Sequence, residues 1–286
     1  MATLRQLRTR VASIANIQRV TNAMQMVAAA KMRRAQEAIE AARPYAQQLE
    51  HILQHLHHSV DAGENPLFSE RPARRVAVVV VTSDRGLCGA FNTNICRKVQ
   101  SELEEPGERE VELVTVGRKA RDYFANRGFA IAQHHADVFR ELEFVRAMEI
   151  AQGLTQSFVA GQMDRVLLVF SEFHSVSQQV PAVHQLLPIV PNAATDEAQA
   201  GDYLFEPSPE ALLETLVPRH VNFQVWRALL ESNAGEQAAR MTAMDNATKN
   251  AGDLLEELTR EMNKERQSSI TLELMDIIGG AEAVSQ

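Results

Sequence analysis

The residues best placed for chemistry form the loop SDRGLCG at positions 83–89. The loop follows the β-branched run VAVVVVT at 76–82, which indicates a buried strand, and it precedes an expected helix. Phosphate-binding loops occupy this place in nucleotide-binding α/β proteins. The sequence lacks both the Gly-Lys-Ser/Thr of a P-loop and the three-glycine dinucleotide pattern. The favoured interpretation is therefore a tight turn, in which Gly86 and Gly89 supply permissive backbone.

The two cysteines, Cys88 and Cys96, offer little reactive chemistry. Cys88 could act as a nucleophile, but the sequence suggests no histidine partner for it, and an ordinary small buried residue is the better interpretation. Two cysteines so close in sequence provide neither a disulfide framework nor a zinc spacing. A reducing compartment fits this usage.

Three histidines, His51, His55 and His58, share one helical face at a spacing that could bind zinc or nickel. Neither a cysteine nor a carboxylate completes the set on that face, so a solvated face is favoured. The carboxylates at 102–105 and 253–261 are interpreted in the same way. We therefore predict no catalytic residue, no metal site and no cofactor.

Two long helices account for both ends of the chain. The first covers residues 3–58 and begins with Leu4, Leu7, Val11 and Ile14 at alternating three- and four-residue steps, which predicts a coiled-coil seam. We expect that seam to continue through Ile17, Met24, Ala28, Met32, Ala35 and Ile39, with a local kink at Pro44. The second covers residues 209–278, about 100 Å of helix. Its seven-residue register runs through Leu230, Ala234, Gln237, Met241, Met244, Thr248, Ala251, Leu255, Leu258 and Met262.

The second helix is some twenty residues longer than the first, and its register stops after Met262. The next seam positions, Glu265 and Ser269, are polar, and apolar residues resume in another phase from Ile270. If the helices pair antiparallel, the C-terminal end extends beyond its partner. An exposed apolar surface there would need a second protein to cover it.

Shorter elements separate the two helices. Strands are expected at 76–82, 110–116 and 165–170, helices near 90–103, 119–126 and 141–159, and an edge strand at 180–190, where prolines occur. The fold class is therefore an antiparallel coiled coil of the terminal helices with an inserted small Rossmann-like α/β domain. The expected boundaries are residues 1–60 for the N-terminal helix, 61–75 for a linker, 76–206 for the α/β domain and 207–286 for the C-terminal helix.

Charge is distributed unevenly along the 286 residues, whose net charge is −8. The first 36 residues carry seven Lys and Arg and neither Asp nor Glu. Such a basic helix can resemble a transit peptide or a nucleic-acid or membrane binder, and it also suits an acidic protein surface. No apolar run approaches the eighteen or more residues of a spanning helix, so we expect a soluble or peripherally attached protein.

Separate segments resemble the γ subunit of bacterial F-type ATP synthases over essentially the full length. They are RVASI at 10–14 leading into TNAMQMVAAAKMR at 21–33, SDRGLCG at 83–89, DYLFEP at 202–207, and EQAARM at 236–241 with RQSSIT at 266–271. The resemblance implies a central rotor without a catalytic site of its own. It also implies partners: the α and β subunits, the ε subunit and the membrane c-ring, on the cytoplasmic face of the bacterial inner membrane, with no nucleic acid.

The resemblance also implies roles for individual residues. The β-subunit contacts would be Arg266, Gln267, Thr271 and Met24, the bearing tip Ile270, Leu274, Ile277 and Ile278, and the c-ring contacts Tyr203, Leu204 and Phe205. Gln25 stands where some relatives carry an acidic residue, and the regulatory cysteine insertion of chloroplast-type chains is not visible, so thiol control is not expected. The alternatives are a free-standing α/β nucleotide-binding enzyme with helical arms, which would bind nucleotide through the 83–89 loop, and a basic scaffold with salt-sensitive nucleic-acid binding.

Overall fold

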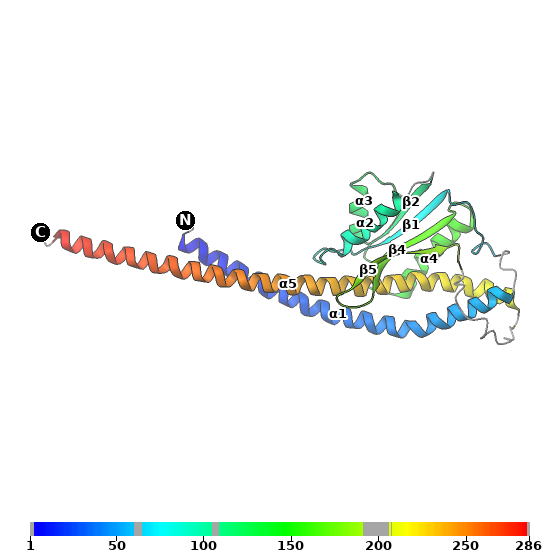
Figure 1. Ribbon diagram of the computed structural model, residues 1–286, viewed down its shortest axis with the longest axis horizontal. Helices are drawn as coiled ribbons and strands as arrows, with labels where there is room; N and C mark the ends of the chain where they lie inside the picture. The colour runs from blue at the N-terminus through cyan, green and yellow to red at the C-terminus, as the bar shows by residue number, and fades with distance from the viewer. Residues whose placement is uncertain (1–2, 60–64, 105–108, 191–205, 207, 285–286) are drawn as a thin grey trace. The chain divides into compact units, whose positions relative to one another are not determined.

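The computed structural model describes residues 3–59, 65–104, 109–190, 206 and 208–284, with a helix at each end of the chain and an α/β domain between them (Figure 1). Their order is α1 (Leu4–Ser59), β1 (Arg75–Val81), α2 (Phe91–Leu103), β2 (Glu110–Val116), α3 (Arg118–Ala125), β3 (Ile131–His135), α4 (Phe144–Val159), β4 (Arg165–Phe173), β5 (Gln179–Leu187) and α5 (Pro209–Val284). The predicted fold class, long terminal helices with an inserted α/β domain, is confirmed.

The five strands form one mixed sheet in the order β3-β2-β1-β4-β5. Strand β1 lies at the centre and pairs parallel with β2 and β4, while β5 pairs antiparallel with β4 at one edge. Residues 76–81 of β1 are all buried because they alternate between two apolar clusters, one against each face of the sheet. The continuous β-branched run is thus explained by burial on both faces.

Strand β3 escaped the sequence analysis. Its sequence IAQHH combines one branched apolar residue with three polar ones, so neither a buried run nor a clean alternation is visible. The strand forms because its backbone pairs with β2 at the opposite edge of the sheet from β5. The predicted edge strand β5 is confirmed, and Pro181 lies within it.

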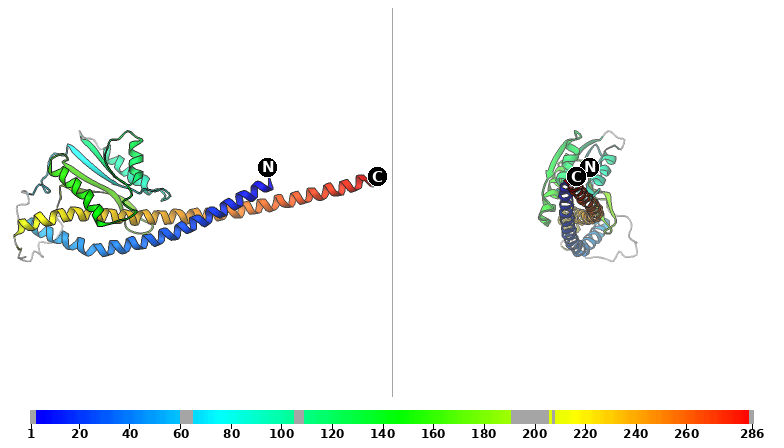
Figure 2. Two further views of the ribbon diagram at one scale, coloured as in Figure 1. Left: turned by 180° about the vertical axis from the view of Figure 1, so that it is seen from behind. Right: turned by 90° about the vertical axis from the view of Figure 1, so that its left-hand side faces the viewer.

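The structure divides into two compact units, and both long helices contribute to each. We call Ala29–Arg240 the foot unit, and Met1–Ala28 together with Met241–Gln286 the coiled-coil unit. Helix α1 continues through Pro44 and α5 through Pro218 without ending. Both prolines lie in the foot unit, where the helices pack beside the α/β elements (Figures 1 and 2).

In the coiled-coil unit, the seam of α1 departs from the predicted one between Ile14 and Ala28, and the predicted seam residue Ala28 is buried. The buried or half-buried positions continue the three- and four-residue alternation to Gln18, Thr21, Gln25 and Ala28. Ile17 is 49% exposed, so its placement in the seam was wrong. A prediction based on apolar residues fails here, because polar side chains occupy this part of the seam. The predicted register of α5 is confirmed in this unit, where Met244, Ala251 and Leu258 are buried.

A glycine at the start of α3 provides a test of the sheet-to-helix connections. Gly117 has φ of +88°, and a Cβ there would lie 2.1 Å from the Thr82 carbonyl oxygen. We predict that Gly117→Ala lowers the free energy of unfolding by more than the roughly 1–3 kcal/mol of backbone strain alone. Gly128→Ala is the matched control, because its φ is +79° but nothing lies within 4 Å of its Cβ position.

Urea denaturation followed by the fluorescence of Trp226, the single tryptophan, measures both variants. Trp226 reports on the foot unit, since its ring lies 5.9 Å from that of Phe144. Equal losses for Gly117→Ala and Gly128→Ala would contradict the predicted backbone clash.

Candidate functional site

The 83–89 loop lies where α/β proteins commonly bind ligands. The loop begins at the carboxyl end of β1. The strands that follow β1 in sequence, β2 and β3, lie on one side of it, and β4 and β5 lie on the other, so β1 and β4 flank the point where the strand order reverses. In open α/β sheets, the crevice at such a switch point is the usual ligand site. The groups around this crevice therefore decide whether the chain could bind a ligand there.

Contacts within the loop hold it in one conformation. The Ser83 amide donates to Asn92 Oδ1 at 2.9 Å, and the Ser83 hydroxyl donates to the Arg85 carbonyl at 2.6 Å. Leu87 adopts φ of 64°, which is uncommon for a bulky residue, and it is 64% exposed. Cys88 is buried, and burial raises the pKa of its thiol. A thiol held in its neutral form is a poor nucleophile, in line with the structural interpretation of Cys88.

Helix α5 fills the space at the carboxyl ends of β1 and β4. The Ser171 amide of β4 donates to Ser232 Oγ at 3.3 Å. A Cβ at Gly235 would lie 3.3 Å from both Phe91 Cε2 and Ser171 Oγ, so the helix backbone approaches β4 and α2 closely. The switch-point crevice therefore holds a helix of the same chain where an enzyme would hold a nucleotide.

Asp84 has a structural role that the sequence analysis missed. Its Oδ1 accepts from the Arg118 and Asp137 amides, both at 3.1 Å. The carboxylate thus ties the 83–89 loop to the beginning of α3 and to the segment after β3, and it also compensates the partial positive charge of a helix N-terminus. Only the spatial proximity of three separate segments could have indicated this role.

Polar layers define the pairing of the two helices in the coiled-coil unit. Gln25 Nε2 donates to Asp245 Oδ1 at 2.9 Å, and Thr248 Oγ1 donates to Thr21 Oγ1 at 2.7 Å. Gln18 Nε2 lies 3.0 Å from the Cβ position of Gly252. The helices are therefore antiparallel, and Gln25 pairs with a carboxylate across the seam.

This register shows where the longer helix loses its partner. Leu4, the first residue of α1, is fourteen residues before Gln18, so it lies level with Arg266, fourteen residues after Gly252. Helix α5 continues to Val284. The predicted extension beyond α1 therefore begins at about Arg266, and Figure 2 shows the C-terminus beyond the N-terminus.

The extension carries large apolar side chains in solvent. Those with at least half of their surface exposed are Ile270, Leu272, Leu274, Met275, Ile277 and Ile278. Soluble proteins seldom expose so many apolar side chains together unless a partner covers them.

Comparisons with known proteins agree over the whole chain. A sequence model of the ATP synthase family matches residues 3–284. The ATP synthase gamma chain of Chlorobaculum parvum is 47% identical over 292 aligned residues, which cover 100% of both chains. That of Pelotomaculum thermopropionicum is 45% identical, covering 99% of this chain and 100% of its own. The chain belongs to the ATP synthase gamma chain family.

Solved structures support the same conclusion about the fold. A chain from the central stalk and c-ring of the Tetrahymena thermophila mitochondrial ATP synthase is 26% identical, with a TM-score of 0.60 over 80% of this chain and 99% of that one. A rotor chain from the Euglena gracilis mitochondrial ATP synthase has a TM-score of 0.68 over 93% of this chain and 98% of that one. The latter is 22% identical and bears on the fold alone.

Apart from the apolar residues of the extension, the residues singled out from the gamma-chain resemblance fall into three groups. Arg266 and Gln267 are exposed at the start of the extension, and Thr271 donates to the Gln267 carbonyl at 2.9 Å. Met24 is half-buried beside the seam. Tyr203, Leu204 and Phe205 lie outside the described residues.

Of the three histidines considered from the sequence as metal ligands, only the side chain of His51 is described. His51 is half-buried on α1, and the side chains of His55 and His58 lie outside the described residues. Within the described part of the chain, no three His, Cys, Asp or Glu side chains form a group that could hold a metal ion. The described helices also include none that is long and apolar enough to cross a bilayer.

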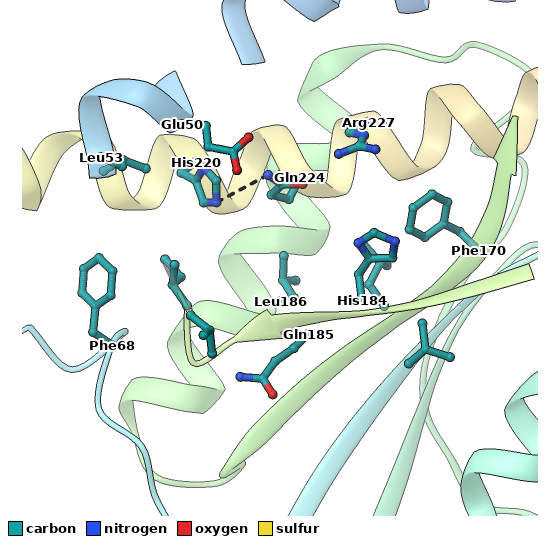
Figure 3. A pocket seen from close by; sticks show the side chains of 14 residues that line it. Glu50, Leu53, Phe68, Phe170, His184, Gln185, Leu186, His220, Gln224 and Arg227 are labelled. Carbon is teal, nitrogen blue, oxygen red and sulfur yellow. Dashed lines mark hydrogen bonds between the residues drawn. The ribbon is translucent and has the colours of Figure 1, made fainter. Parts of the chain in front are cut away.

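The foot unit of this gamma chain also contains a cavity of about 450 Å³ (Figure 3). Its walls come from α1, β4, β5, α5 and the segment before β1, and they include Glu50, Leu53, Phe68, His184, His220 and Gln224. Burial lowers the pKa of His220, an effect that the charge of Glu50 opposes. Gln224 Nε2 lies 3.4 Å from His220 Nε2, where it can donate to a neutral imidazole.

The lowered pKa of His220 predicts a pH dependence of stability. The folded-state pKa lies below the unfolded value of about 6.5, so the unfolded chain binds the proton more readily. The contribution of His220 is therefore complete above about pH 6.5 and is lost as the pH falls toward the folded-state value.

We predict that His220→Gln reduces the loss of stability between pH 7.5 and pH 5.5. Urea titrations followed by Trp226 fluorescence at the two pH values measure this difference. His174→Gln, on the exposed turn between β4 and β5, is the control for the effect of replacing any histidine by glutamine. A His220→Gln chain that keeps the wild-type pH dependence would show that this histidine does not titrate differently on folding.

Proposed function

We propose that this chain is the central rotor shaft of an F-type ATP synthase, coupling ion flow through the membrane c-ring to ATP synthesis or hydrolysis on the β subunits. The observation that carries the proposal is the apolar extension of α5 beyond Arg266, which needs a surrounding partner. Family membership supports the same function. The α, β and ε subunits and the c-ring are its partners, and the chain is a peripheral part of a membrane complex on the cytoplasmic face of the bacterial inner membrane.

The chain itself carries no catalytic site in this proposal. The filled switch-point crevice and the buried, neutral Cys88 thiol argue against the alternative of a free-standing nucleotide-binding enzyme. The basic first helix suits an acidic surface of a β subunit, since Arg5, Arg8, Arg10 and Arg19 are all exposed.

Coupling follows from the asymmetry of the shaft. A two-helix rod cannot match the symmetry of a ring of alternating α and β subunits, so at each angle it presents a different face to each β subunit. A difference in contact free energy between conformations shifts each β subunit toward one conformation and one nucleotide affinity. Ion flow would turn the rod and so change the nucleotide affinity of each β subunit in turn.

In this mechanism, Arg266, Gln267, Thr271 and Met24 contact the β subunits, and Ile270, Leu274, Ile277 and Ile278 form the bearing tip. A guanidinium that loses its hydrogen-bonded partner costs roughly 1.5–3 kcal/mol. Apolar contacts near the end of a helix are individually much weaker. The two kinds of contact can therefore be separated by mutation.

We predict that Arg266→Ala weakens assembly or coupled ATP turnover more than deletion of residues 281–286, which follow Gly279 and Gly280. Membrane-bound ATP hydrolysis and ATP-driven ion pumping are measured for both variants. Arg260→Ala is the control, because Arg260 pairs with Glu256 of its own helix. An active Arg266→Ala complex beside an inactive truncation would place the essential contacts in the final residues.

A second prediction concerns Tyr203, Leu204 and Phe205, which we propose to contact the c-ring. A Phe205→Cys chain should crosslink to a cysteine in the polar loop of a c subunit in intact membranes. Asn126→Cys, at the end of α3, is the control position. Efficient crosslinking of residue 205 to α or β alone would show that the foot unit faces away from the membrane.

A further inference from the structure

Three polar residues lie along one face of α5 within the foot unit. Ser232, Glu236 and Arg240 are spaced four residues apart, so they follow each other on one side of the helix. Arg240 is the last residue of the foot unit, and α5 continues as helix into the coiled-coil unit at Met241. We call these three residues the α5 stripe.

The stripe contacts two different parts of the α/β domain. Ser232 Oγ accepts from the Ser171 amide of β4 at 3.3 Å. Arg240 Nη2 donates to the Gly86 carbonyl in the 83–89 loop at 3.2 Å, and it pairs with Glu236 Oε1 at 2.7 Å. The helix is therefore joined by hydrogen bonds to both neighbouring strand ends of the switch point.

All three residues are shielded from water. Ser232 is 1% exposed, and the side chains of Arg240 and Glu236 are 12% and 7% exposed. Burial raises the pKa of Glu236, while Arg240 opposes that shift and Lys31 contributes in the same direction as Arg240. Breaking one member of such a pair would leave a buried polar group without its partner, so the arrangement resists distortion.

These polar contacts oppose a roll of α5 about its axis more specifically than its apolar packing does. Close packing also resists a roll, but three of the fully buried residues Ala228, Leu229, Ala234 and Ala238 carry only a methyl group and interlock little with their neighbours. A roll of about 20° moves a side-chain end some 5–6 Å from the axis by about 2 Å. Hydrogen bonds do not survive a displacement of that size.

We propose that the α5 stripe is a clamp that fixes the rotational setting of α5 on the sheet of the foot unit, so that a twist of the helix is carried to the α/β domain. Ser232, Glu236 and Arg240 are thus positioning residues. The inference rests on the proposed rotor function and adds the residues through which torque enters the foot unit. It gives the buried polar groups around the 83–89 loop a mechanical function.

The clamp predicts a change in torsional stiffness. Complexes of this chain with α and β subunits are immobilised and stalled with a non-hydrolysable ATP analogue, and a gold nanorod is attached to Asn126→Cys in the foot unit. Cys88 and Cys96 are buried, so the label goes to residue 126. The variance of the nanorod angle is inversely proportional to the torsional stiffness of the chain. We expect Arg240→Leu to increase this variance at least about twofold.

A reversible crosslink shows whether Arg240→Leu loosens the attachment of α5 to the sheet or makes the whole foot unit more flexible. The Cβ position of Gly235 lies 3.3 Å from Ser171 Oγ, close to the roughly 3 Å between Cβ and the far sulfur of a disulfide. Adding Ser171→Cys and Gly235→Cys to Arg240→Leu should restore the wild-type variance under oxidising conditions, and dithiothreitol should remove the restoration. ATP hydrolysis close to the wild-type rate shows that the complex is assembled.

The control is Lys98→Ala, which removes another i, i+4 ion pair of the foot unit, with Glu102 on α2. An Arg240→Leu variance equal to that of Lys98→Ala, or an increase that the disulfide does not reverse, overturns the clamp. If Arg240→Leu fails to assemble, Ser232→Ala carries the same test. Failure of the wild-type chain to support hydrolysis-driven rotation would overturn the rotor function itself.

Discussion

The structure depends on a single requirement, which is that the apolar side chains of one 76-residue helix, α5, be covered along its length. In the foot unit, α/β elements and α1 bury residues such as Val217, Val221, Leu229 and Ala234 almost completely. In the coiled-coil unit, α1 alone covers one seam, so burial falls to single positions such as Met244, Ala251 and Leu258. Beyond Arg266 the described chain offers no cover. Burial is thus greatest where α5 packs against several elements and least where α1 has ended.

The same requirement explains why a Rossmann-like sheet here need not imply nucleotide chemistry. The crevice at the carboxyl ends of β1 and β4 would be a natural ligand site, but Ser232, Gly235 and Arg240 of α5 occupy it. Gly235 favours this close approach, because a Cβ there would lie only 3.3 Å from Phe91 Cε2 and Ser171 Oγ. A fold therefore supplies a site only if the rest of the chain leaves that site open.

Polar residues in the helix pairing have a role that hydrophobic patterning alone does not suggest. Gln18, Thr21 and Gln25 interrupt an otherwise apolar seam, and Thr21 and Gln25 meet polar partners on α5 at 2.7 and 2.9 Å. Polar layers of this kind are satisfied in one register only, whereas an alanine-rich seam can slide. They thus define which residue of α5 lies level with the first residue of α1, and hence how much of α5 extends beyond it.

The sequence by itself determined the fold class, the strand at 76–81, the edge position of β5, the seam of α5 and the unpartnered apolar end. Each is encoded locally, in a continuous β-branched run, in the prolines of an edge strand or in a helical period of 3.5 or 3.6 residues. It did not determine β3, whose polar residues are held by pairing with β2, or the seam at Gln18, because Ile17 is the more apolar of the two neighbouring residues. Only the tertiary structure placed the Asp84 carboxylate between two backbone amides and the α5 stripe against the 83–89 loop. These contacts join residues 34 to 154 positions apart, and no local pattern records which distant groups will meet.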